Sequence, residues 1–465
     1  MTLPSLDFKT LRAAYAAGTS TPVAVVEQLL ARIDAQGDDG VWTYKLPAAA
    51  AIARARELES LPASEKAALP LYGLPFTVKD CIDIAGMPTT CACPDFAYTA
   101  DRTHVSVQRA LDAGAILIGK TNLDQFATGV VGVRSPYGVA RNPFDAAYIP
   151  GGSSSGAAVS VSAGLCAFAF GSDTGGSGRV PASYNNVIGL KPTLGLFSRS
   201  GMTNANLSFD TVSIYALTAP DALEVMETCQ AVDPADPYGR AAPASPPPAP
   251  EGRPLRIAIP KRTDLEFFGN DEAAALYAAG LRTLAEQGNE LTEIDFGVFV
   301  ETGNMMFGDA WIAERYAVFG DFILTHPDSV DPVVREVVLS ATAYTASDAF
   351  KAMYRLHRNA RKIRRTFERA DLIAVPTVGT VYRIAEVKAD PIQKNITNGR
   401  YTNFVNMSDL AAIAVPNGFL ANGVPMGLTF VGPAFSDAFL ASFGARFHRQ
   451  RVSTLGATGA PHPTA

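Results

Sequence analysis

The sequence predicts an α/β fold, in which helices cover a central β-sheet. Short apolar runs typical of buried strands alternate along the chain with segments of helical periodicity, and this alternation favours a layered arrangement. Of the 465 residues, 48% are hydrophobic and 18% are charged, which is ordinary for a globular protein and excludes a disordered or fibrous one. A chain of this length can bury a large core without disulfides or metals.

The first predicted elements are a helix and a strand. Pro22 after Thr21 suits the first turn of a helix, and apolar residues from Val23 to Ile33 then recur at the spacing of one helical face. The apolar run at 74–79 predicts a strand that ends in a lysine. A helix at 105–113 and a buried strand at 115–119 follow.

Residues 151–172 carry no charge and approach the length that spans a membrane. They open with Gly151 and Gly152 and contain serine and glycine throughout, whereas a membrane span needs mostly large apolar side chains. We therefore expect a loop followed by a helix of small residues that packs closely inside the protein.

The second half of the chain adds two short apolar strands, predicted at 255–259 and 372–375. The one break in composition is the proline-rich stretch 241–254, which we interpret as a surface crossover rather than a domain boundary. We therefore predict a single domain over residues 1–450. Residues 451–465 are small and polar, and we expect a frayed C-terminal tail.

Charge and cysteine content restrict the class of function. The net charge of −6 predicts no basic face, so we expect no nucleic-acid partner. Five cysteines, an odd number in so long a chain, form no disulfide framework and indicate a reducing compartment. The first residues lack a basic region followed by an apolar one, so we expect no signal peptide, no membrane partner and a cytoplasmic location.

Two segments rich in glycine and serine stand out, at 151–156 and 171–181. Glycines beside a serine let the backbone turn sharply and direct several N–H groups at one point, as an oxyanion hole next to a nucleophile requires. A flexible loop or a phosphate-binding turn would look similar, although no Gly-Lys-Ser/Thr follows at the required spacing. Residues 152–156 also match G-x-S-x-G, but the strand that must precede a nucleophile elbow is missing.

A serine nucleophile needs a base, and histidine is the usual one. The five histidines all lie outside the two segments, and we interpret them as surface or helix residues. Lysine can serve instead if burial makes it neutral. Lys79 is the candidate because it ends an apolar strand. The alternative is a lysine on a solvated strand face.

Lys79, Ser153 and Ser177, with the segments around them, resemble the Ser–cis-Ser–Lys triad of the amidase signature family. The resemblance spans nearly the whole chain and implies one mixed central β-sheet surrounded by α-helices. It implies that Lys79 is the base, Ser153 the proton relay after a cis peptide bond, and Ser177 the nucleophile. It also implies that no cofactor is needed. Its oxyanion donors would be the N–H groups of Thr174, Gly175, Gly176 and Ser177, and Ser154 would hydrogen-bond Lys79.

Within that family, the sequence is most similar to the amidase domains of allophanate hydrolases. The similarity lies in the segments 122–129, 134–138, 233–238 and 401–406 and in Trp311-Ile-Ala-Glu-Arg315. It implies that Arg315 holds a substrate carboxylate, since a guanidinium matches a carboxylate with two hydrogen bonds. Phe307 stands where the family has a tyrosine that contacts substrate, and Gly138 is the third substrate-binding residue implied.

The function predicted is therefore hydrolysis of a C–N bond in a small amide or urea, with release of ammonia. The alternatives are a urethanase or a general amidase or carbamate hydrolase, which Phe307 permits, and the glutamine-hydrolysing subunit of a tRNA amidotransferase, which would need partner subunits. A binding module without activity is disfavoured because all three triad residues are present. The substrate, a possible homodimer and a missing C-terminal domain stay open. The spacing of Cys91, Cys93 and His104 fits no common zinc site, so we expect no metal.

Overall fold

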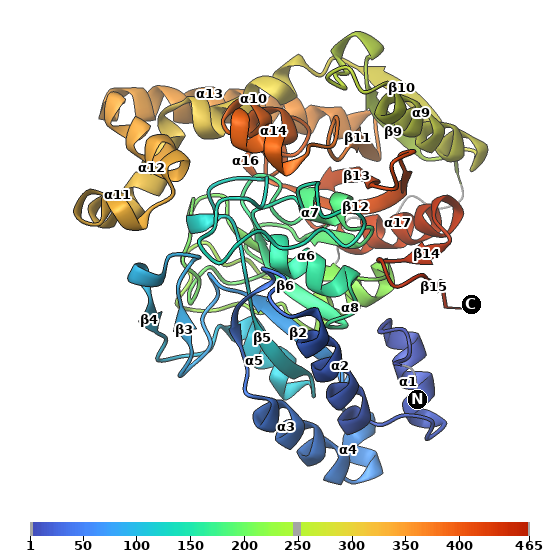
Figure 1. The fold of residues 1–465 in the computed structure, drawn as a ribbon. Helices are drawn as coiled ribbons and strands as arrows, with labels where there is room; N and C mark the ends of the chain where they lie inside the picture. Colours follow the sequence, from blue (N-terminus) through green and yellow to red (C-terminus); the bar gives the residue numbers. More distant parts are fainter. Residues whose placement is uncertain (1–2, 245–252, 464–465) are drawn as a thin grey trace.

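The computed structural model describes residues 3–244 and 253–463, and one mixed sheet of eleven strands runs through it (Figure 1). In order across the sheet the strands are β1 (Trp42–Lys45), β5 (Ile116–Thr121), β2 (Pro75–Lys79), β6 (Phe168–Asp173), β8 (Thr211–Ala216), β7 (Ile188–Lys191), β12 (Leu410–Phe419), β13 (Pro425–Pro433), β11 (Leu372–Pro376), β9 (Arg256–Pro260) and β10 (Glu290–Ile294). Two small hairpins pair β3 (Pro88–Thr89) with β4 (Tyr98–Thr99) and β14 (Thr454–Leu455) with β15 (Ala460–Pro461).

The sheet combines parallel and antiparallel pairs. Strand β2 lies between β5 and β6 and is parallel to both. The strands from β6 to β11 pair antiparallel, and β9 is parallel to β11 and β10. The predicted α/β fold with one mixed central sheet is therefore confirmed, and the three adjacent parallel strands end at the same edge.

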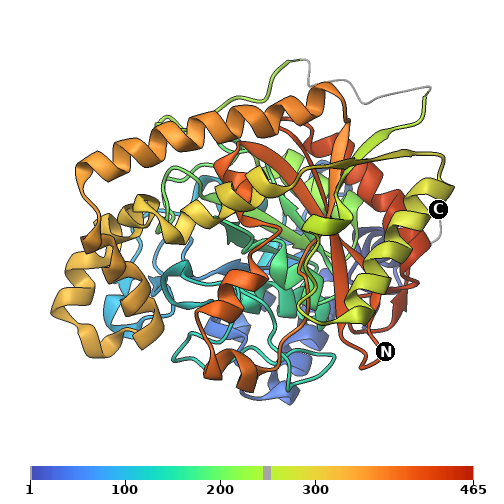
Figure 2. The same ribbon diagram turned by 90° about the horizontal axis from the view of Figure 1, so that it is seen from above.

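Helices surround the sheet (Figures 1 and 2). They are α1 (Phe8–Ala16), α2 (Pro22–Gln36), α3 (Ala48–Ser60), α4 (Ala63–Ala67), α5 (Val105–Asp112), α6 (Ser155–Ser162), α7 (Val180–Tyr184), α8 (Ala219–Cys229), α9 (Asp271–Glu286), α10 (Gly297–Gly308), α11 (Ala313–Thr325), α12 (Pro332–Leu339), α13 (Ala346–Arg364), α14 (Ile384–Ala389), α15 (Gln393–Asn398), α16 (Asn403–Met407) and α17 (Asp437–Arg451). Short 3-10 turns are η1 (Pro94–Phe96), η2 (Gln125–Ala127), η3 (Arg262–Asp264), η4 (Ala310–Ile312), η5 (Pro327–Ser329), η6 (Ser340–Ala343) and η7 (Arg365–Glu368).

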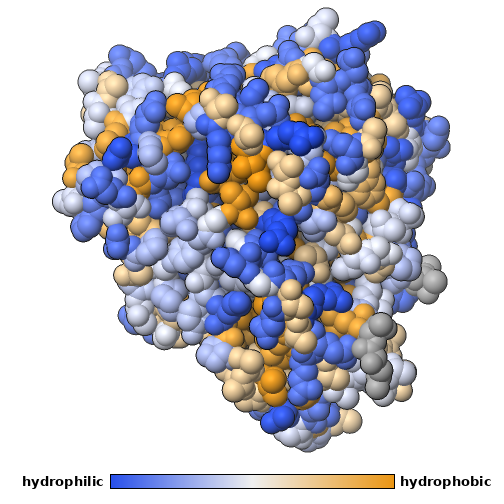
Figure 3. Space-filling view, viewed as in Figure 1, coloured by the Kyte–Doolittle hydropathy of each residue, from blue (hydrophilic) through white to orange (hydrophobic). Residues whose placement is uncertain are grey.

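Both faces of the sheet are buried in its middle. On β12, Ile413 and Val415 join the large core on one side, while Leu410 and Ala412 pack on the other side with Phe404 of α16. Alternate residues of a strand point to opposite faces, so this division shows that the strand is covered on both. None of the described helices is long and apolar enough to cross a membrane, and in Figure 3 apolar side chains form patches among polar ones.

The predicted elements of the first half form close to their expected bounds. Thr21 caps α2, its hydroxyl accepting a hydrogen bond from the Ala24 N–H at 3.2 Å, and Pro22 is the first helical residue. The predicted strands at 74–79 and 115–119 are β2 and β5, and the helix at 105–113 is α5. Later, β9 and β11 match the strands predicted at 255–259 and 372–375.

The predicted loop after residue 151 and the small-residue helix both form, but the helix does not extend to residue 172 as predicted. Helix α6 ends at Ser162, and Gly164 adopts a positive φ of 67° just beyond it. The chain then enters β6, whose residues 168–173 are all buried between β2 and β8. Small residues continue across this boundary, and Gly164 is the one local signal that the helix stops.

The predicted frayed tail is also wrong for the residues described. Strands β14 and β15 form a hairpin, and Leu455 is fully buried. The Asn186 side-chain amide donates to the carbonyls of Thr454 and Gly456, at 3.1 and 2.9 Å. This segment is held because an apolar side chain is buried and backbone carbonyls find partners in the body of the protein.

The proline-rich crossover predicted at 241–254 falls largely on residues 245–252, which lie outside the described residues. The flanking residues 241–244 are exposed. The central sheet takes strands from residue 42 to residue 433. The single domain over residues 1–450 stays a prediction.

The hairpin gives a test of stability. Leu455→Ala should lower the free energy of unfolding by about 2–5 kcal/mol, because it leaves a cavity under β14. Thermal unfolding of this variant, compared with the control Thr458→Ala outside the hairpin core, measures the effect. Wild-type midpoints for both variants would mean that the tail contributes nothing to stability and is frayed after all.

Candidate active site

The site lies where the parallel strands β5, β2 and β6 end. Lys79 is the last residue of β2 and pairs with Thr121 at the end of β5, while Val78 pairs with Phe170 of β6. The segments that follow β5 and β6 carry the motifs of the sequence, at 122–129 and 174–181. Crevices at the carboxyl ends of parallel strands are the usual places for binding sites in α/β folds.

Lys79 is buried and surrounded by hydroxyl groups. Its side chain has no exposed surface, and Nζ donates to Ser153 Oγ at 2.7 Å and to Ser172 Oγ at 2.8 Å. Within residues 3–244 and 253–463, no carboxylate forms an ion pair with it. Burial lowers the pKa of the amine, although the Cys81 thiol and the carboxylates of Asp124 and Asp210 oppose this. The alternative of a solvated lysine is therefore wrong.

Ser172 is the contact that the sequence analysis missed. Ser154 is the residue expected beside Lys79, but its hydroxyl donates instead to the Ser172 carbonyl at 3.0 Å and accepts from the Ser172 N–H at 3.2 Å. Ser154 thus reaches Lys79 only through Ser172. A signal was present, because Ser172 lies in the second glycine- and serine-rich segment and follows the apolar run of β6.

Ser153 lies two residues before α6 and is held there by the segment after β5. The peptide bond between Gly152 and Ser153 is cis, which confirms that prediction. The Ser153 carbonyl accepts from the Asp124 N–H at 3.0 Å, and the Asp124 carboxylate accepts from the N–H groups of Val131 and Gly132. A side chain at Gly152 would collide with Asp124, so this approach requires glycine.

The loop that carries Ser177 is organised by a buried ion pair. Asp173 ends β6, and its carboxylate accepts from Arg179 Nε and Nη2 at 2.9 and 3.0 Å. Burial alone would raise the pKa of Asp173, but the guanidinium outweighs it and the pKa is lowered. Tyr215 of β8 donates to the Ser177 carbonyl at 2.6 Å. Arg179 also donates to Asn406 Oδ1 at 3.0 Å, and this hydrogen bond links the loop to helix α16.

The backbone of this loop departs from the prediction at one residue. The Gly176 N–H donates to Asp173 Oδ1 at 2.8 Å, so it is already engaged and is a poor oxyanion donor. Gly176 has a φ of 135°, and a Cβ there would collide with Thr402. A glycine is therefore needed at position 176 for the turn, and not for binding an oxyanion. For Thr174, Gly175 and Ser177 the donor role stays a prediction, and Thr174 is fixed by a hydroxyl bond to Asp210 at 2.5 Å.

Arg315 is buried on α11 and incompletely paired. Its Nη1 donates to Thr128 Oγ1 at 3.1 Å and to the Ala127 carbonyl at 3.3 Å, and the guanidinium lies 5.0 Å from the centre of the Phe307 ring. Among described residues, Nε has no hydrogen-bond partner and no carboxylate forms an ion pair with the group. Burial lowers the pKa of Arg315 to about 10, so it stays a cation at neutral pH.

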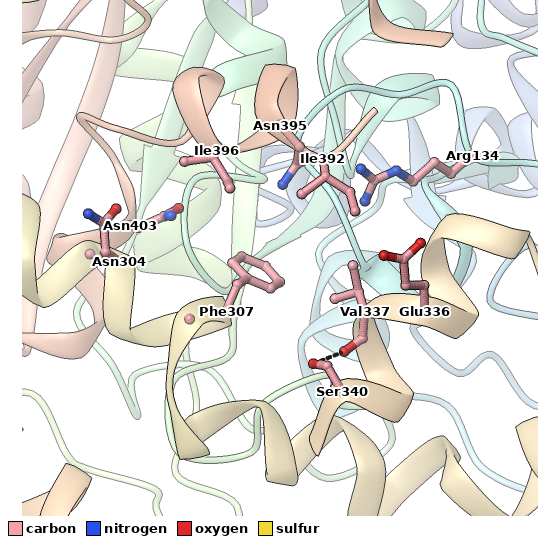
Figure 4. Close-up of a pocket in the computed structure, with 12 residues that line it drawn as sticks. Arg134, Asn304, Phe307, Glu336, Val337, Ser340, Ile392, Asn395, Ile396 and Asn403 are labelled. Atoms are coloured by element: carbon pink, nitrogen blue, oxygen red, sulfur yellow. Dashed lines mark hydrogen bonds between the residues drawn. The ribbon is translucent and has the colours of Figure 1, made fainter. Parts of the chain in front are cut away.

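Phe307 lines a pocket of about 380 Å³ (Figure 4). Its ring lies near the middle of the labelled side chains, most of which come from helices, whereas Arg134 comes from a loop. The lining residues are Arg134, Gly303, Asn304, Phe307, Gly308, Glu336, Val337, Ser340, Ile392, Asn395, Ile396 and Asn403. Arginine and asparagine side chains interleave with apolar ones here, which suits a small polar ligand.

Two other predictions concern residues outside this cluster. Gly138 lies in an exposed turn, where its carbonyl accepts from Asn122 Nδ2 at 3.0 Å, and its substrate-binding role stays a prediction. His104 is not a surface or helix residue: it is buried before α5, and its ring accepts from the Ser106 N–H. In the part of the chain that the structure describes, no three metal-ligating side chains cluster.

Known proteins are similar to this chain in sequence and fold. Residues 24–440 match the family model described as Amidase. The chain is 41% identical to the urea amidolyase of Lachancea kluyveri over 93% of its own length but only 24% of that protein's. It is 32% identical to a glutamyl-tRNA(Gln) amidotransferase subunit from Chloroflexus aggregans, over 96% of this chain and 97% of that one.

Among solved structures, a variant of allophanate hydrolase from Kluyveromyces lactis superimposes with a TM-score of 0.90 and 38% identity. The match covers 96% of this chain and 73% of that one. The chain thus spans about a quarter of the matched urea amidolyase and most of the matched allophanate hydrolase. The protein belongs to the amidase family, whose enzymes hydrolyse carbon–nitrogen bonds other than peptide bonds.

Proposed function

We propose that this amidase hydrolyses a small amide or urea that carries a carboxylate, with allophanate as the substrate, and that it does so through an acyl-enzyme. The observation that carries the chemistry is the Lys79 amine, buried at 2.7 Å from the Ser153 hydroxyl with serine hydroxyls as its near partners. Similarity to allophanate hydrolase supports the substrate.

In the proposed reaction, neutral Lys79 accepts a proton from Ser153 Oγ while Ser153 takes the proton of Ser177 Oγ. The Ser177 oxygen then attacks the substrate carbonyl, and the N–H groups of Thr174, Gly175 and Ser177 bind the oxyanion. The proton returns through Ser153 to the leaving nitrogen, ammonia departs, and the acyl group stays on Ser177. Water attacks the ester along the same path and releases the acid.

Arg315 supplies the proposed selectivity. A buried guanidinium that lacks a carboxylate partner in the described protein favours an anion from outside, because the ion pair would then form away from bulk water. The stacked Phe307 ring covers one face of the group and leaves its edge for a bidentate contact.

A second candidate is hydrolysis of neutral carbamates or simple amides, including urethanes. Phe307 favours it, because the ring presents no hydroxyl to a polar substrate where the family has a tyrosine. The tRNA amidotransferase subunit is a weaker alternative, since it would act with partner subunits. We also propose a cytoplasmic location, which is supported by five cysteines that are all free and buried.

The base role of Lys79 predicts the pH dependence of turnover. Only the neutral amine accepts a proton, so kcat should rise with pH through an apparent pKa below the value of about 10.4 for free lysine. Lys79→Ala should lower kcat by about a thousandfold, and Lys79→Arg should not restore it because arginine stays charged. Steady-state ammonia release across neutral and alkaline pH measures both.

Labelling by a fluorophosphonate provides the control for that experiment. Wild type should be labelled at Ser177, and Ser177→Ala and Lys79→Arg should stay unlabelled while keeping the far-ultraviolet circular dichroism of the wild type. An active Lys79→Arg with the wild-type pH profile would make Lys79 a structural residue and leave another group as the base.

The role of Arg315 predicts a change in substrate preference. Ammonia release should be measured for allophanate, biuret, ethyl carbamate and acetamide. Arg315→Ala should lower kcat/KM for allophanate about 10- to 150-fold and leave the neutral substrates within about twofold, because the lost contact is to a charged group. Arg335→Ala on α12, whose guanidinium donates to the Pro327 carbonyl, is the matched control. If wild type preferred ethyl carbamate or acetamide, the second candidate would replace the first.

A further inference from the structure

Asn403 is a pocket residue that contacts the nucleophile loop. It begins α16, lines the pocket beside Phe307 and is 8% exposed. Its side chain packs among three glycines, so that a Cβ on Gly175 would lie 2.9 Å, and one on Gly399 2.8 Å, from its Oδ1. A Cβ on Gly303 of α10 would lie 3.2 Å from the Asn403 Cβ. The amide thus lies directly against the loop that precedes Ser177.

The Asn403 amide differs from its neighbours because its oxygen has no partner. Within residues 3–244 and 253–463, no donor reaches Asn403 Oδ1. By contrast, Asn395 Oδ1 accepts from the Val130 N–H at 2.8 Å, and the Asn406 amide donates to the Asp173 carbonyl at 2.8 Å. A buried acceptor without a donor destabilises the fold, and such groups in native proteins call for a functional explanation.

We infer that Asn403 Oδ1 accepts a hydrogen bond from the scissile nitrogen of the substrate and so selects amides over esters. This inference deepens the proposed function and rests on its acyl-transfer chemistry. The substrate carbonyl oxygen would lie at the N–H groups of the loop, including Gly175, which Asn403 contacts. The nitrogen to be released is bonded to the same carbon and carries the donors, so it lies within reach of an acceptor that packs against that loop.

Three small acids separate the possible contacts. Allophanate and malonamate share the terminal amide and the carboxylate, and differ only in NH against CH2 between the two carbonyl carbons. Monomethyl malonate replaces the terminal amide of malonamate by an ester, which has no N–H. The contact of Asn403 is thus available to the first two substrates and not to the third.

The test compares Asn403→Leu with wild type on these substrates. Leucine has nearly the same shape as asparagine but no acceptor. The variant should lose about tenfold in kcat/KM on allophanate and malonamate and stay within about twofold on the ester. Its thermal midpoint should equal or exceed that of wild type, because the amide oxygen it removes has no partner among the described residues. Asn422→Leu, in the exposed turn between β12 and β13, should leave kcat/KM on the amides and on the ester unchanged.

An equal loss on amide and ester, or a lowered thermal midpoint, would assign Asn403 a structural role and overturn the inference. A loss confined to allophanate would overturn it too, since the contact would then be to the inner nitrogen. Asn403→Ala, judged by the same amide-to-ester ratio, serves if leucine prevents folding. A wild type that hydrolyses malonamate but not allophanate contradicts the proposed substrate and leaves this test intact. If it hydrolyses neither acid, propionamide and methyl propionate form the matched pair.

Discussion

The hydrogen bond from Lys79 to Ser153 is the interaction on which the rest of the site depends. A lysine that serves as a base must lose its charge, and full burial among hydroxyls favours that loss. The surrounding fold keeps nearby acids engaged elsewhere. Asp80, the residue after Lys79, forms a buried ion pair with Lys120 of β5 at 2.8 Å, and Asp173 is paired with Arg179. Asp124, whose charge opposes the lowering of the Lys79 pKa, accepts backbone N–H groups instead of forming an ion pair with the amine.

A second constraint joins the chemistry to the pocket. Asp173 fixes the loop on both sides of Ser177 through backbone N–H groups and Arg179, and Arg179 also donates to Asn406 of α16. The same helix begins with Asn403, whose amide lies against that loop. Arg315 approaches from α11 through Thr128, which belongs to the segment after β5. The residues proposed to act on the substrate thus come from the ends of β2, β5 and β6 and from the helices α11 and α16.

The chemical residues were more predictable from the sequence than the contacts between them. Residue types alone left a solvated Lys79 and a flexible or phosphate-binding loop open, and it was the resemblance to the amidase signature family that implied the triad of Lys79, Ser153 and Ser177. The contacts could not be predicted, because they depend on which strands are neighbours and a single sequence does not give the strand order of a sheet. They are the bond from Lys79 to Ser172, the bond from the Gly176 N–H to Asp173, and the Asp173–Arg179 ion pair.

The strands β12 and β13 were not predicted from the sequence. They are the longest strands described and are buried on both faces, so they lack the alternation that marks a half-exposed strand. The C-terminal hairpin escaped because its stability comes from distant partners such as Asn186.

Direct titration of Lys79 tests the central claim most sharply. Lysines labelled with ¹³C at Cε can be followed by NMR as the pH is raised, with Lys79→Met identifying the signal of Lys79. If Lys79 is a neutral base in the resting enzyme, this signal must titrate with a pKa clearly below that of free lysine, which is about 10.4. If Lys79 instead stayed charged throughout that lower range, it would be no base at neutral pH, and the proton relay through Ser153 would be contradicted.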